Sequence, residues 1–574
     1  MKMSKKLLKS KKSMASKDYS GLDKNELIKV IEKLESRKKY GLIWDEEKVK
    51  EQFEKDAENA FPVLKEITSK EIIDKDASKP TNILIEGDNY HALSVLNFTH
   101  QGKIDVIYID PPYNTGTKDW KYSNDYVDIN DEFRHSKWLS FMAKRLRLAK
   151  NLLKVDSGVL ICTIDDNEHA ALGLLLQELF PNYEIVGVVI VHNPAGVQGK
   201  NFSYTHEIAY FVYPKNSKCI GTTARDKDLI SPLRDWGGTS ARKLAKTCFY
   251  PVIIKDEKIL GFGEVCAEAF HPKSANVLQK DGSIYIYPID GHGIERKWVY
   301  SRSSAEKNID QLSVKKIDNE YVIIRRKSAF TYRTVWDDKK YYANIFGSKL
   351  LNDIVPDNFP FPKSLYAVED CIKAVIHDKD DAVILDFFAG SGTTGHAVLE
   401  LNKQDDGDRQ FILCTNNENN IATDICYPRI EKIIRGYKSQ KGQKVEGLGG
   451  SLKYFKTKFV KTNSNSDDFK TRITNECTEM LCLREGVFNE IKKTTNYRIF
   501  QQGDKTLAVY YSLKRDNLPA LKKELEKIEG EKTLYCFTLD PIGLSRTEFA
   551  GWHGVTLEPI PQKILDVYKQ IYEY

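Results

Sequence analysis

The sequence lacks the long apolar runs that cross membranes. None of its hydrophobic segments approaches the roughly 20 residues that a membrane-spanning helix needs. The first residues, M-K-M-S-K-K-L-L-K-S-K-K, are basic, but the apolar stretch of a secretory signal does not follow them. We therefore expect a cytoplasmic protein without a membrane partner.

The sequence also lacks a metal-binding pattern and a dominant charge. Its ten cysteines are scattered, and the nearest two, Cys477 and Cys482, have no second Cys/His pair close by to complete a zinc site. We expect reduced, mostly buried thiols and no metal. The 87 Lys and Arg residues nearly balance the 81 Asp and Glu residues, so the net charge of +6 permits a polyanionic partner without requiring one.

The pattern of elements changes along the chain, whose 574 residues exceed what one hydrophobic core usually supports. Residues 1–75 read as a basic tail and a helical segment. Residues 76–215 and 351–444 alternate short buried strands with helices, which predicts an α/β fold with a mostly parallel, doubly wound sheet. Residues 216–350 are short strands and loops rich in Gly, Lys, Arg and Tyr, and they predict an inserted domain. Residues 445–574 predict a C-terminal α+β domain.

One predicted strand ends in an unusual turn, D-V-I-Y-I-D-P-P-Y-N-T-G. Asp110 lies at the carboxyl end of the strand, where open α/β sheets bind ligands. Pro111 and Pro112 lack an N–H and stiffen the turn, so its carbonyls remain as acceptors in a fixed direction. Tyr113 adds a flat face. An acid, a carbonyl and a stacking ring suit a planar amine on an aromatic heterocycle, and a plain Asp-Pro-Pro turn is the alternative.

A second stretch, D-F-F-A-G-S-G-T-T-G, follows another buried strand and opens a helix. Gly390, Gly392 and Gly395 have the spacing G-x-G-x-x-G, which lets a ligand approach the backbone at a helix N-terminus. This spacing alone would also suit a dinucleotide oxidoreductase, or a turn that binds nothing. No Lys-Ser/Thr follows the last glycine, which disfavours an NTP-binding P-loop.

Together, Asp110-Pro111-Pro112-Tyr113 and D-F-F-A-G-S-G-T-T resemble the catalytic and S-adenosylmethionine motifs of amino-methylating DNA methyltransferases. Their order resembles that of the β-class, with the catalytic motif first. Further segments, among them I-E-G-D-N-Y-H-A-L and C-T-N-N-E-N-N, resemble the modification (Mod) subunits of type III restriction-modification systems. The resemblance extends from about residue 20 over nearly the whole chain. It implies a Rossmann-like S-adenosylmethionine-dependent fold, with 216–350 as the DNA target-recognition domain.

The resemblance also implies roles for individual residues. Asp110 and Pro111 would grip the amine of a flipped base stacked on Tyr113, and Pro112 would stiffen the turn. The implied cofactor contacts are Asp88, Lys363, Ser364, Asp386, Phe388, Gly390, Ser391, Gly392, Thr393 and Glu418. The implied contacts to the target base and to DNA are Asn114, Phe202, Tyr204, Arg242, Arg296, Trp298, Arg325 and Arg326. Ordinary hairpin core is the alternative for Phe202 and Tyr204, and a solvated surface charge is the alternative for each basic residue.

The implied reaction is direct transfer of the S-adenosylmethionine methyl group to adenine N6 in double-stranded DNA. An Asp at position 110 favours adenine over cytosine N4, where a Ser is more usual in the family. Two other classes remain open: a dinucleotide oxidoreductase, which leaves Asp110 to Tyr113 unexplained, and a non-catalytic DNA-recognition subunit. The sequence holds no helicase or nuclease motif, so cleavage would require a separate restriction subunit. The family also suggests a homodimer.

Overall fold

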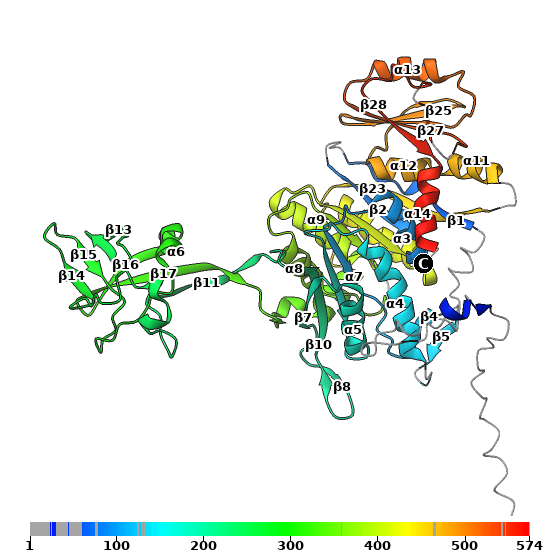
Figure 1. Cartoon of the computed structure of the whole chain (residues 1–574). Helices are drawn as coiled ribbons and strands as arrows, with labels where there is room; N and C mark the ends of the chain where they lie inside the picture. Colours follow the sequence, from blue (N-terminus) through cyan, green and yellow to red (C-terminus); the bar gives the residue numbers. More distant parts are fainter. Residues whose placement is uncertain are drawn as a thin grey trace, which may run out of the picture.

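The computed structural model has a body built around one large sheet, a lobe that projects from this body, and a smaller C-terminal sheet (Figure 1). It describes residues 60–74, 79–122, 125–128, 130, 133–356, 359–462, 466–540, 543–545 and 547–572, together with 23, 24, 26–29 and 44. Most of the basic tail and helical segment predicted for 1–75 therefore lies outside the described residues.

Ten strands form the central sheet, and six of their nine neighbouring pairs are parallel, which confirms the predicted α/β fold. The inner strand β3 is apolar throughout and β6 contains only one polar residue, Thr163, because both faces of the sheet are covered. In sheet order the strands are β1 (Ala60–Glu66), β23 (Ser451–Lys461), β2 (Thr81–Glu86), β20 (Gln410–Thr415), β19 (Val383–Asp386), β3 (Val106–Ile109), β6 (Val159–Ile164), β10 (His206–Pro214), β7 (Tyr183–Val191) and β18 (Val335–Trp336).

The sheet extends beyond both predicted limits of the α/β domain. Strand β1 lies within 1–75, where the residue pattern predicts helix rather than strand. Strand β23 lies within 445–574 and pairs with both β1 and β2. The predicted boundaries at 76 and 444 are therefore wrong. The two strands are joined by a pairing between opposite ends of the chain, which local periodicity does not reveal.

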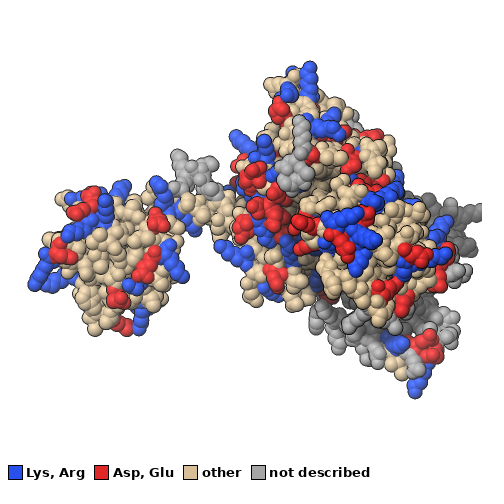
Figure 2. All heavy atoms as spheres, turned by 90° about the horizontal axis from the view of Figure 1, so that it is seen from above, with Lys and Arg blue, Asp and Glu red and all other residues tan. Residues whose placement is uncertain are grey.

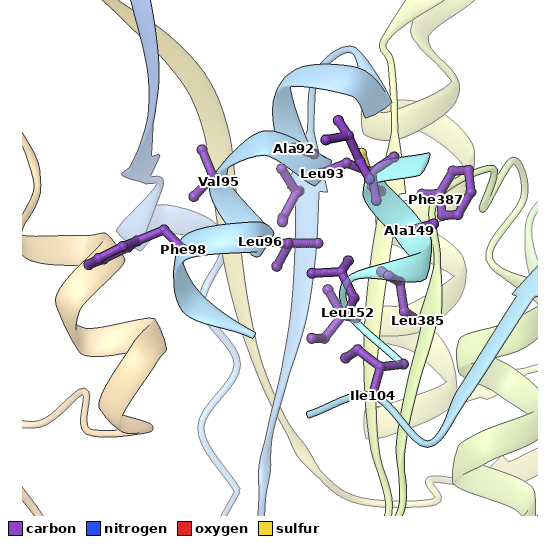
Figure 3. Close-up of a cluster of buried hydrophobic side chains, with 14 of the residues drawn as sticks. Ala92, Leu93, Val95, Leu96, Phe98, Ile104, Ala149, Leu152, Leu385 and Phe387 are labelled. Carbon is purple, nitrogen blue, oxygen red and sulfur yellow. The ribbon is translucent and has the colours of Figure 1, made fainter. Parts of the chain in front are cut away.

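Helices cover both faces of the sheet. One face carries α3 (Asn89–Thr99), α4 (Arg134–Lys150) and α5 (His169–Leu179), and the other carries α7 (Leu350–Ile354), α8 (Leu365–Val375), α9 (Thr393–Asp405) and α10 (Tyr427–Arg435). Figure 3 shows the first of these cores, where Leu96, Leu152 and Leu385 meet between helix and sheet. Side chains alternate along β3, since Ile107 packs in this core and Tyr108 packs in the opposite one.

The inserted lobe stands on two long antiparallel strands, β11 (Thr222–Pro232) and β17 (Glu320–Thr331), which reach out from the body (Figure 1). Its other elements are β12 (Val252–Lys255), β13 (Lys258–Phe262), β14 (Asn276–Leu278), β15 (Ile284–Ile286), α6 (Arg302–Lys307) and β16 (Leu312–Ile317). Strand β18 already pairs with β7 of the central sheet. The insertion therefore ends before residue 335, and the predicted limit at 350 is too late.

The C-terminal sheet packs against the body and shares its core. The strands are β24 (Glu490–Lys493), β25 (Tyr497–Gln502), β26 (Lys505–Tyr510), β27 (Glu531–Phe537) and β28 (Val555–Ile560), with helices α11 (Ser466–Glu476), α12 (Thr478–Glu485), α13 (Leu518–Glu526) and α14 (Gln562–Tyr572). Tyr568 of α14 donates a hydrogen bond to the Pro62 carbonyl of β1 at 2.5 Å. Met480 and Phe500 belong to the same hydrophobic cluster as Leu93. Apolar packing thus anchors this region beside β1, the edge strand of the central sheet.

All ten cysteines are free, and eight of them are buried, in agreement with the prediction of mostly buried thiols. Among the described residues, no helix has both the length and the apolar character needed to span a membrane. The same residues hold no cluster of three or more His, Cys, Asp or Glu side chains arranged to bind a metal ion.

The core of the lobe depends on Trp298, which the sequence predicts to be a DNA contact. Its side chain is only 2% exposed, packs against Leu233 and Tyr250, and donates an indole hydrogen bond to the Tyr250 carbonyl at 2.8 Å. The prediction of a DNA contact is therefore wrong for Trp298. Its basic neighbours in G-I-E-R-K-W-V-Y predict a charged surface, whereas the pairing of Trp298 with Arg234 turns the ring inward.

We predict that Trp298→Ala destabilises the lobe by about 3–5 kcal/mol, because a large cavity opens and a buried carbonyl loses its donor. Trp236→Ala is the matched control, since Trp236 is 65% exposed and its loss should change stability by no more than about 0.5 kcal/mol. Hydrogen exchange of the lobe strands measures both. Equal protection in the two variants would contradict the assignment.

Candidate active site

The carboxyl ends of the parallel strands bring the two sequence motifs together. Strands β19 and β3 are neighbours, so Asp386 at the end of β19 and Asp110 just after β3 lie at the same edge of the sheet. The helix that follows β3 covers one face, and the helix that follows β19 covers the other. This is the topological switch point at which open α/β sheets form a ligand crevice.

Asp110 is held by a buried hydroxyl of the next strand. Thr163 of β6 donates a hydrogen bond to Asp110 Oδ1 at 2.7 Å, and the Thr163 side chain is fully buried. The Asp110 side chain remains 28% exposed. The Thr163 hydroxyl therefore fixes the orientation of the carboxylate, which is still open to a ligand.

The Pro-Pro turn is locked from behind by Trp138 of α4. The Trp138 indole donates to the Pro112 carbonyl at 2.7 Å. In the part of the chain that the structure describes, no hydrogen bond reaches the Pro111 carbonyl. The turn thus keeps one fixed carbonyl available beside Asp110, as the proline spacing predicts.

Asn114 closes the turn from inside rather than facing DNA. Its backbone φ is 58°, a left-handed conformation that Asn tolerates, and its side chain is completely buried. The amide donates to Glu168 Oε1 at 2.5 Å, and the His135 ring contacts the same oxygen. The prediction of a base or DNA contact for Asn114 is therefore wrong, because the turn requires its amide as an internal brace.

A lysine joins the catalytic turn to a second carboxylate that the sequence does not single out. The Lys363 ammonium lies 3.1 Å from Asp110 Oδ1 and 2.5 Å from Oε2 of Glu207, which is on β10. It also contacts the Tyr113 hydroxyl, which donates to Glu207 Oε2 at 3.0 Å. The sequence predicts Lys363 as a cofactor contact, whereas the structure places its ammonium among the catalytic residues.

Charge balance explains why these buried groups are compatible. Burial would raise the pKa of Glu207, but the Lys363 ammonium, His192 and two hydrogen bonds lower it below its usual value. Burial likewise opposes the charge on Lys363, yet the carboxylates of Asp110 and Glu207 raise the pKa of its ammonium. Burial raises the pKa of Tyr113 well above its ordinary value, so its hydroxyl stays protonated and can donate. Two carboxylates and one ammonium leave the cluster with one net negative charge.

Asp386 begins the glycine loop and is itself buried. Its carboxylate accepts the Phe388 N–H at 2.9 Å and the Thr394 hydroxyl at 2.5 Å. Burial raises the pKa of Asp386 to about 7, the two hydrogen bonds oppose this, and the charge of Asp110 adds to it. The site therefore contains a carboxyl group that changes charge near neutral pH.

The glycine loop presents its backbone to the crevice. Gly390 and Gly392 have φ of 49° and 80°, so each adopts a left-handed conformation that other residues rarely accept. Gly392 precedes the first residue of α9, Thr393. The Ser391 and Thr393 hydroxyls both accept hydrogen bonds from Arg429 Nη1, at 3.0 and 2.8 Å, which ties the loop to the buried arginine. Cofactor contacts by these two residues stay a prediction.

Arg429 is fully buried beneath the loop, and no carboxylate partner occurs among the described residues. Burial lowers the pKa of its guanidinium to about 10, although the side chain remains charged at neutral pH. Its Nε, moreover, has no hydrogen-bond partner within the described part of the chain. An uncompensated positive charge under a helix N-terminus favours an anionic ligand above it.

The remaining predicted cofactor residues lie at or near the same edge. Asp88 follows β2, caps α3 by accepting the Tyr90 N–H at 2.7 Å, and keeps 42% of its side chain exposed. Phe388 is partly buried against Phe141, at 5.8 Å between ring centroids. Glu418 is exposed three residues beyond β20, in a short 3-10 turn. Ser364 is buried and donates to the Lys340 carbonyl at 2.8 Å, which gives it a structural contact instead.

The aromatic residues predicted to wall the base pocket lie on a projecting hairpin, β8 (Val197–Gln198) and β9 (Ser203–Tyr204). Phe202 is 78% exposed and Tyr204 is 52% exposed. Neither is hairpin core, which removes that alternative. In this structure the two side chains also do not wall an enclosed pocket, because most of their surface faces solvent.

Most of the arginines predicted to read DNA hold the lobe together. Arg242 binds Glu295 at 2.9 Å and two backbone carbonyls, and Arg296 binds Asp290 at 2.8 Å. Arg325 donates to the Ser231 hydroxyl at 3.0 Å, while Arg326 is exposed. Figure 2 shows other basic side chains along the rim of the lobe, with acidic ones between them. The internal ion pairs give Arg242 and Arg296 structural roles within the lobe, and DNA contacts by these two arginines stay a prediction.

Sequence reasoning missed Thr163, Glu207 and Arg429. Glu207 interrupts the apolar strand H-E-I-A-Y-F-V-Y, and a carboxylate buried at 3% exposure signals a functional or paired group. Arg429 similarly occupies the apolar face of the helix Y-P-R-I-E-K-I-I-R. Both signals require knowing which face of the element is buried, and the sequence alone leaves that open.

Comparison with known proteins agrees with this geometry. A family model described as DNA methylase matches residues 104–425, more than half of the chain. The type II methyltransferase M.KpnI of Klebsiella pneumoniae is 33% identical over 371 residues, which are 59% of this chain and 82% of that protein. The EcoPI Mod subunit of Escherichia phage P1, a type III restriction-modification enzyme, is 29% identical over 59% of this chain. The alignment spans only 58% of that subunit's length.

A probable type III Mod subunit of Haemophilus influenzae, HindVI, is 25% identical over 82% of this chain and 68% of its own length. Among solved structures, the M1.HpyAVI-SAM complex is 14% identical over 61% of this chain and 98% of its own, with a TM-score of 0.29, too low to support a structural argument. The family match contains Asp110, Lys363 and the glycine loop, and it covers most of the catalytic edge. The chain therefore belongs to the DNA methylases and is a DNA methyltransferase.

Proposed function

We propose that this enzyme transfers the methyl group of S-adenosylmethionine to N6 of an adenine that is flipped out of double-stranded DNA. The observation that carries the proposal is the pairing of two motifs at one switch point. Asp110, the Pro111 carbonyl and Tyr113 lie on one strand end, and the glycine loop lies on its neighbour. Cytosine N4 is the alternative target, since it presents the same amine geometry.

The residues at the loop fit the methionine end of this cofactor. A helix N-terminus with two left-handed glycines offers N–H groups to a carboxylate, and the buried Arg429 adds positive charge behind them. The Asp386 carboxylate would pair with the cofactor's ammonium group. Asp88 and Glu418, at and beyond the ends of β2 and β20, are placed for the adenosine end. When bound, the cofactor supplies a methyl group activated by a positively charged sulfur.

Asp110 and the Pro111 carbonyl would each accept one hydrogen from the target amine. The nitrogen lone pair is normally delocalised into the base, and these two acceptors favour the pyramidal form in which it is available. The net negative charge of the Asp110, Glu207 and Lys363 cluster stabilises the positive charge that develops on nitrogen. Tyr113 holds the base by stacking. Its plane is fixed because Glu207 and Lys363 both engage the hydroxyl.

The restriction context also belongs to this proposal. Two relatives named above are Mod subunits of type III enzymes, and no nuclease or helicase motif is present in the sequence. We infer that the protein acts in the cytoplasm as the modification subunit of such a system, alongside a separate restriction subunit, or as an orphan relative. We also infer that the protein forms a homodimer.

We predict that Asp110→Asn lowers kcat for methyl transfer by about 100- to 1,000-fold, because the acceptor charge is lost while the shape is kept. Binding of cofactor and DNA should persist. Asp105→Asn is the matched control at the opposite end of the same strand, where the carboxylate pairs with Lys154 at 2.8 Å and Lys379 at 2.9 Å. It should lower stability and leave kcat of the folded enzyme unchanged. Retained activity in Asp110→Asn would refute the catalytic assignment.

We predict that Lys363→Met and Glu207→Gln each reduce kcat by about 10- to 100-fold with little change in the KM for DNA, since both groups fix Asp110 and Tyr113 rather than bind the DNA backbone. Lys154→Met, which removes another partly buried ion pair, serves as control and should leave kcat intact. Steady-state kinetics separate the two constants. A rise in KM alone would show that Lys363 acts in binding and not in positioning.

A pH dependence follows from the raised pKa of Asp386, about 7. The carboxylate is charged above that pH and protonated below it, so affinity for the cationic cofactor should fall by about tenfold per pH unit below 7. Isothermal titration calorimetry between pH 8 and 5.5 measures this. Asp386→Asn should bind more weakly at pH 8 and show a nearly flat profile; a flat profile in the unaltered enzyme would contradict the role.

A further inference from the structure

The hairpin formed by β8 and β9 extends from the catalytic edge of the sheet. It lies between β7 and β10, whose register ends with His206 opposite Val191. Strand β10 begins at the edge where β3 and β6 end, because it runs antiparallel to β6. Figure 1 shows the hairpin, labelled β8, projecting away from the body. Residues 192–205 therefore project beyond the ligand edge of the sheet, with β8 and β9 paired as a separate two-stranded sheet.

Large apolar side chains are concentrated at the tip of this hairpin. Val197 is 64% exposed, Phe202 is 78% exposed and Tyr204 is 52% exposed. Exposed apolar groups of this size, gathered on one small element, mark a surface that is covered by a partner. Lys200 lies in the same turn and is exposed, so the tip combines aromatic surface with a positive charge.

The turn itself is well defined. The Gly199 N–H donates to the Phe202 carbonyl at 3.0 Å, and Val197 pairs with Tyr204. A Cβ on Gly199 would lie 3.1 Å from the Tyr204 ring and 2.7 Å from the Phe202 carbonyl, so the glycine lets the chain close over the ring. The tip is thus held in one shape, with Phe202 pointing into solvent.

The hairpin is also tied to the catalytic centre through the chain. Glu207 lies three residues after Tyr204 and accepts the Tyr113 hydroxyl hydrogen bond at 3.0 Å. The shorter arm of the hairpin contains the four residues 202–205, which can reach roughly 13 Å beyond the sheet. This reach exceeds the depth of the major groove of B-DNA, about 8.5 Å, so the tip can approach the duplex from which a base at Tyr113 has been drawn.

We propose that the hairpin tip enters the DNA duplex beside the flipped nucleotide and that Phe202 stacks in the space which the target base has left. This inference rests on the proposed function, because it requires an extruded base. Flipping costs the stacking and pairing energy of one nucleotide, and an inserted aromatic ring restores part of the stacking. Lys200 would lie near the backbone phosphates. Because the chain belongs to a DNA methylase family, DNA is the partner that covers this surface, and its stacked bases contact the aromatic tip.

The experiment compares two duplexes that contain the recognised site, which sequencing of methylated host DNA identifies. One duplex has the normal base pair at the target, and the other has an abasic position opposite the target, which lowers the cost of flipping. Phe202→Ala should reduce kcat/KM by roughly 10- to 100-fold on the paired duplex and by less than about threefold on the abasic one. Phe202→Trp should retain activity on both.

Ile73→Ala is the matched control, because Ile73 is 77% exposed and follows Ile72, which pairs with Leu452 of β23 at the other side of the sheet from β7 and β10. It should leave both rates unchanged. Equal losses in Phe202→Ala on the two duplexes, or no loss on either, would overturn the wedge while leaving the methyltransferase reaction intact. If the unaltered enzyme methylates neither duplex, the proposed function fails first, and the wedge fails with it.

Discussion

The ion-paired cluster at the end of β3 is the interaction on which the site depends. Asp110 must remain charged and correctly oriented at a largely buried edge, beside Glu207 and near the carboxyl group of Asp386. Three acids so close together would repel one another, and burial would favour their neutral forms. The Lys363 ammonium, placed between two of them, makes the arrangement stable and leaves one net negative charge for chemistry.

The rest of the fold positions this cluster. Strand β3 leads into Asp110, β6 contains Thr163, β10 contains Glu207 and β19 ends in Asp386. These four strands are neighbours in a single sheet. The lysine arrives from the other half of the chain, just before α8, after the long detour through the inserted lobe. Separate segments of the sequence therefore complete one site only when the sheet is assembled. The lobe stands apart from the body on the two strands β11 and β17 (Figure 1).

Much of the fold could be predicted from the sequence, since inner strands such as β3 and β19 are short apolar runs whose ends carry the motif residues. Asp110, Tyr113 and the glycine loop could be predicted from the sequence for the same reason. Strands β1 and β23 were not, because their pairing joins residues nearly 400 positions apart and depends on tertiary contacts. Glu207 and Arg429 were hidden within apolar elements. Conversely, the segments around Trp298, Arg242 and Arg296 predict a basic surface, whereas the structure buries Trp298 and pairs the two arginines with Glu295 and Asp290.

The central claim is that an amine held by Asp110 receives the methyl group, and that this amine is adenine N6. Nucleoside mass spectrometry tests it most directly, using DNA incubated with the purified enzyme and an isotopically labelled methyl donor. The account predicts label in N6-methyladenine at one sequence motif. Label in N4-methylcytosine, in another base or in no nucleoside would contradict it.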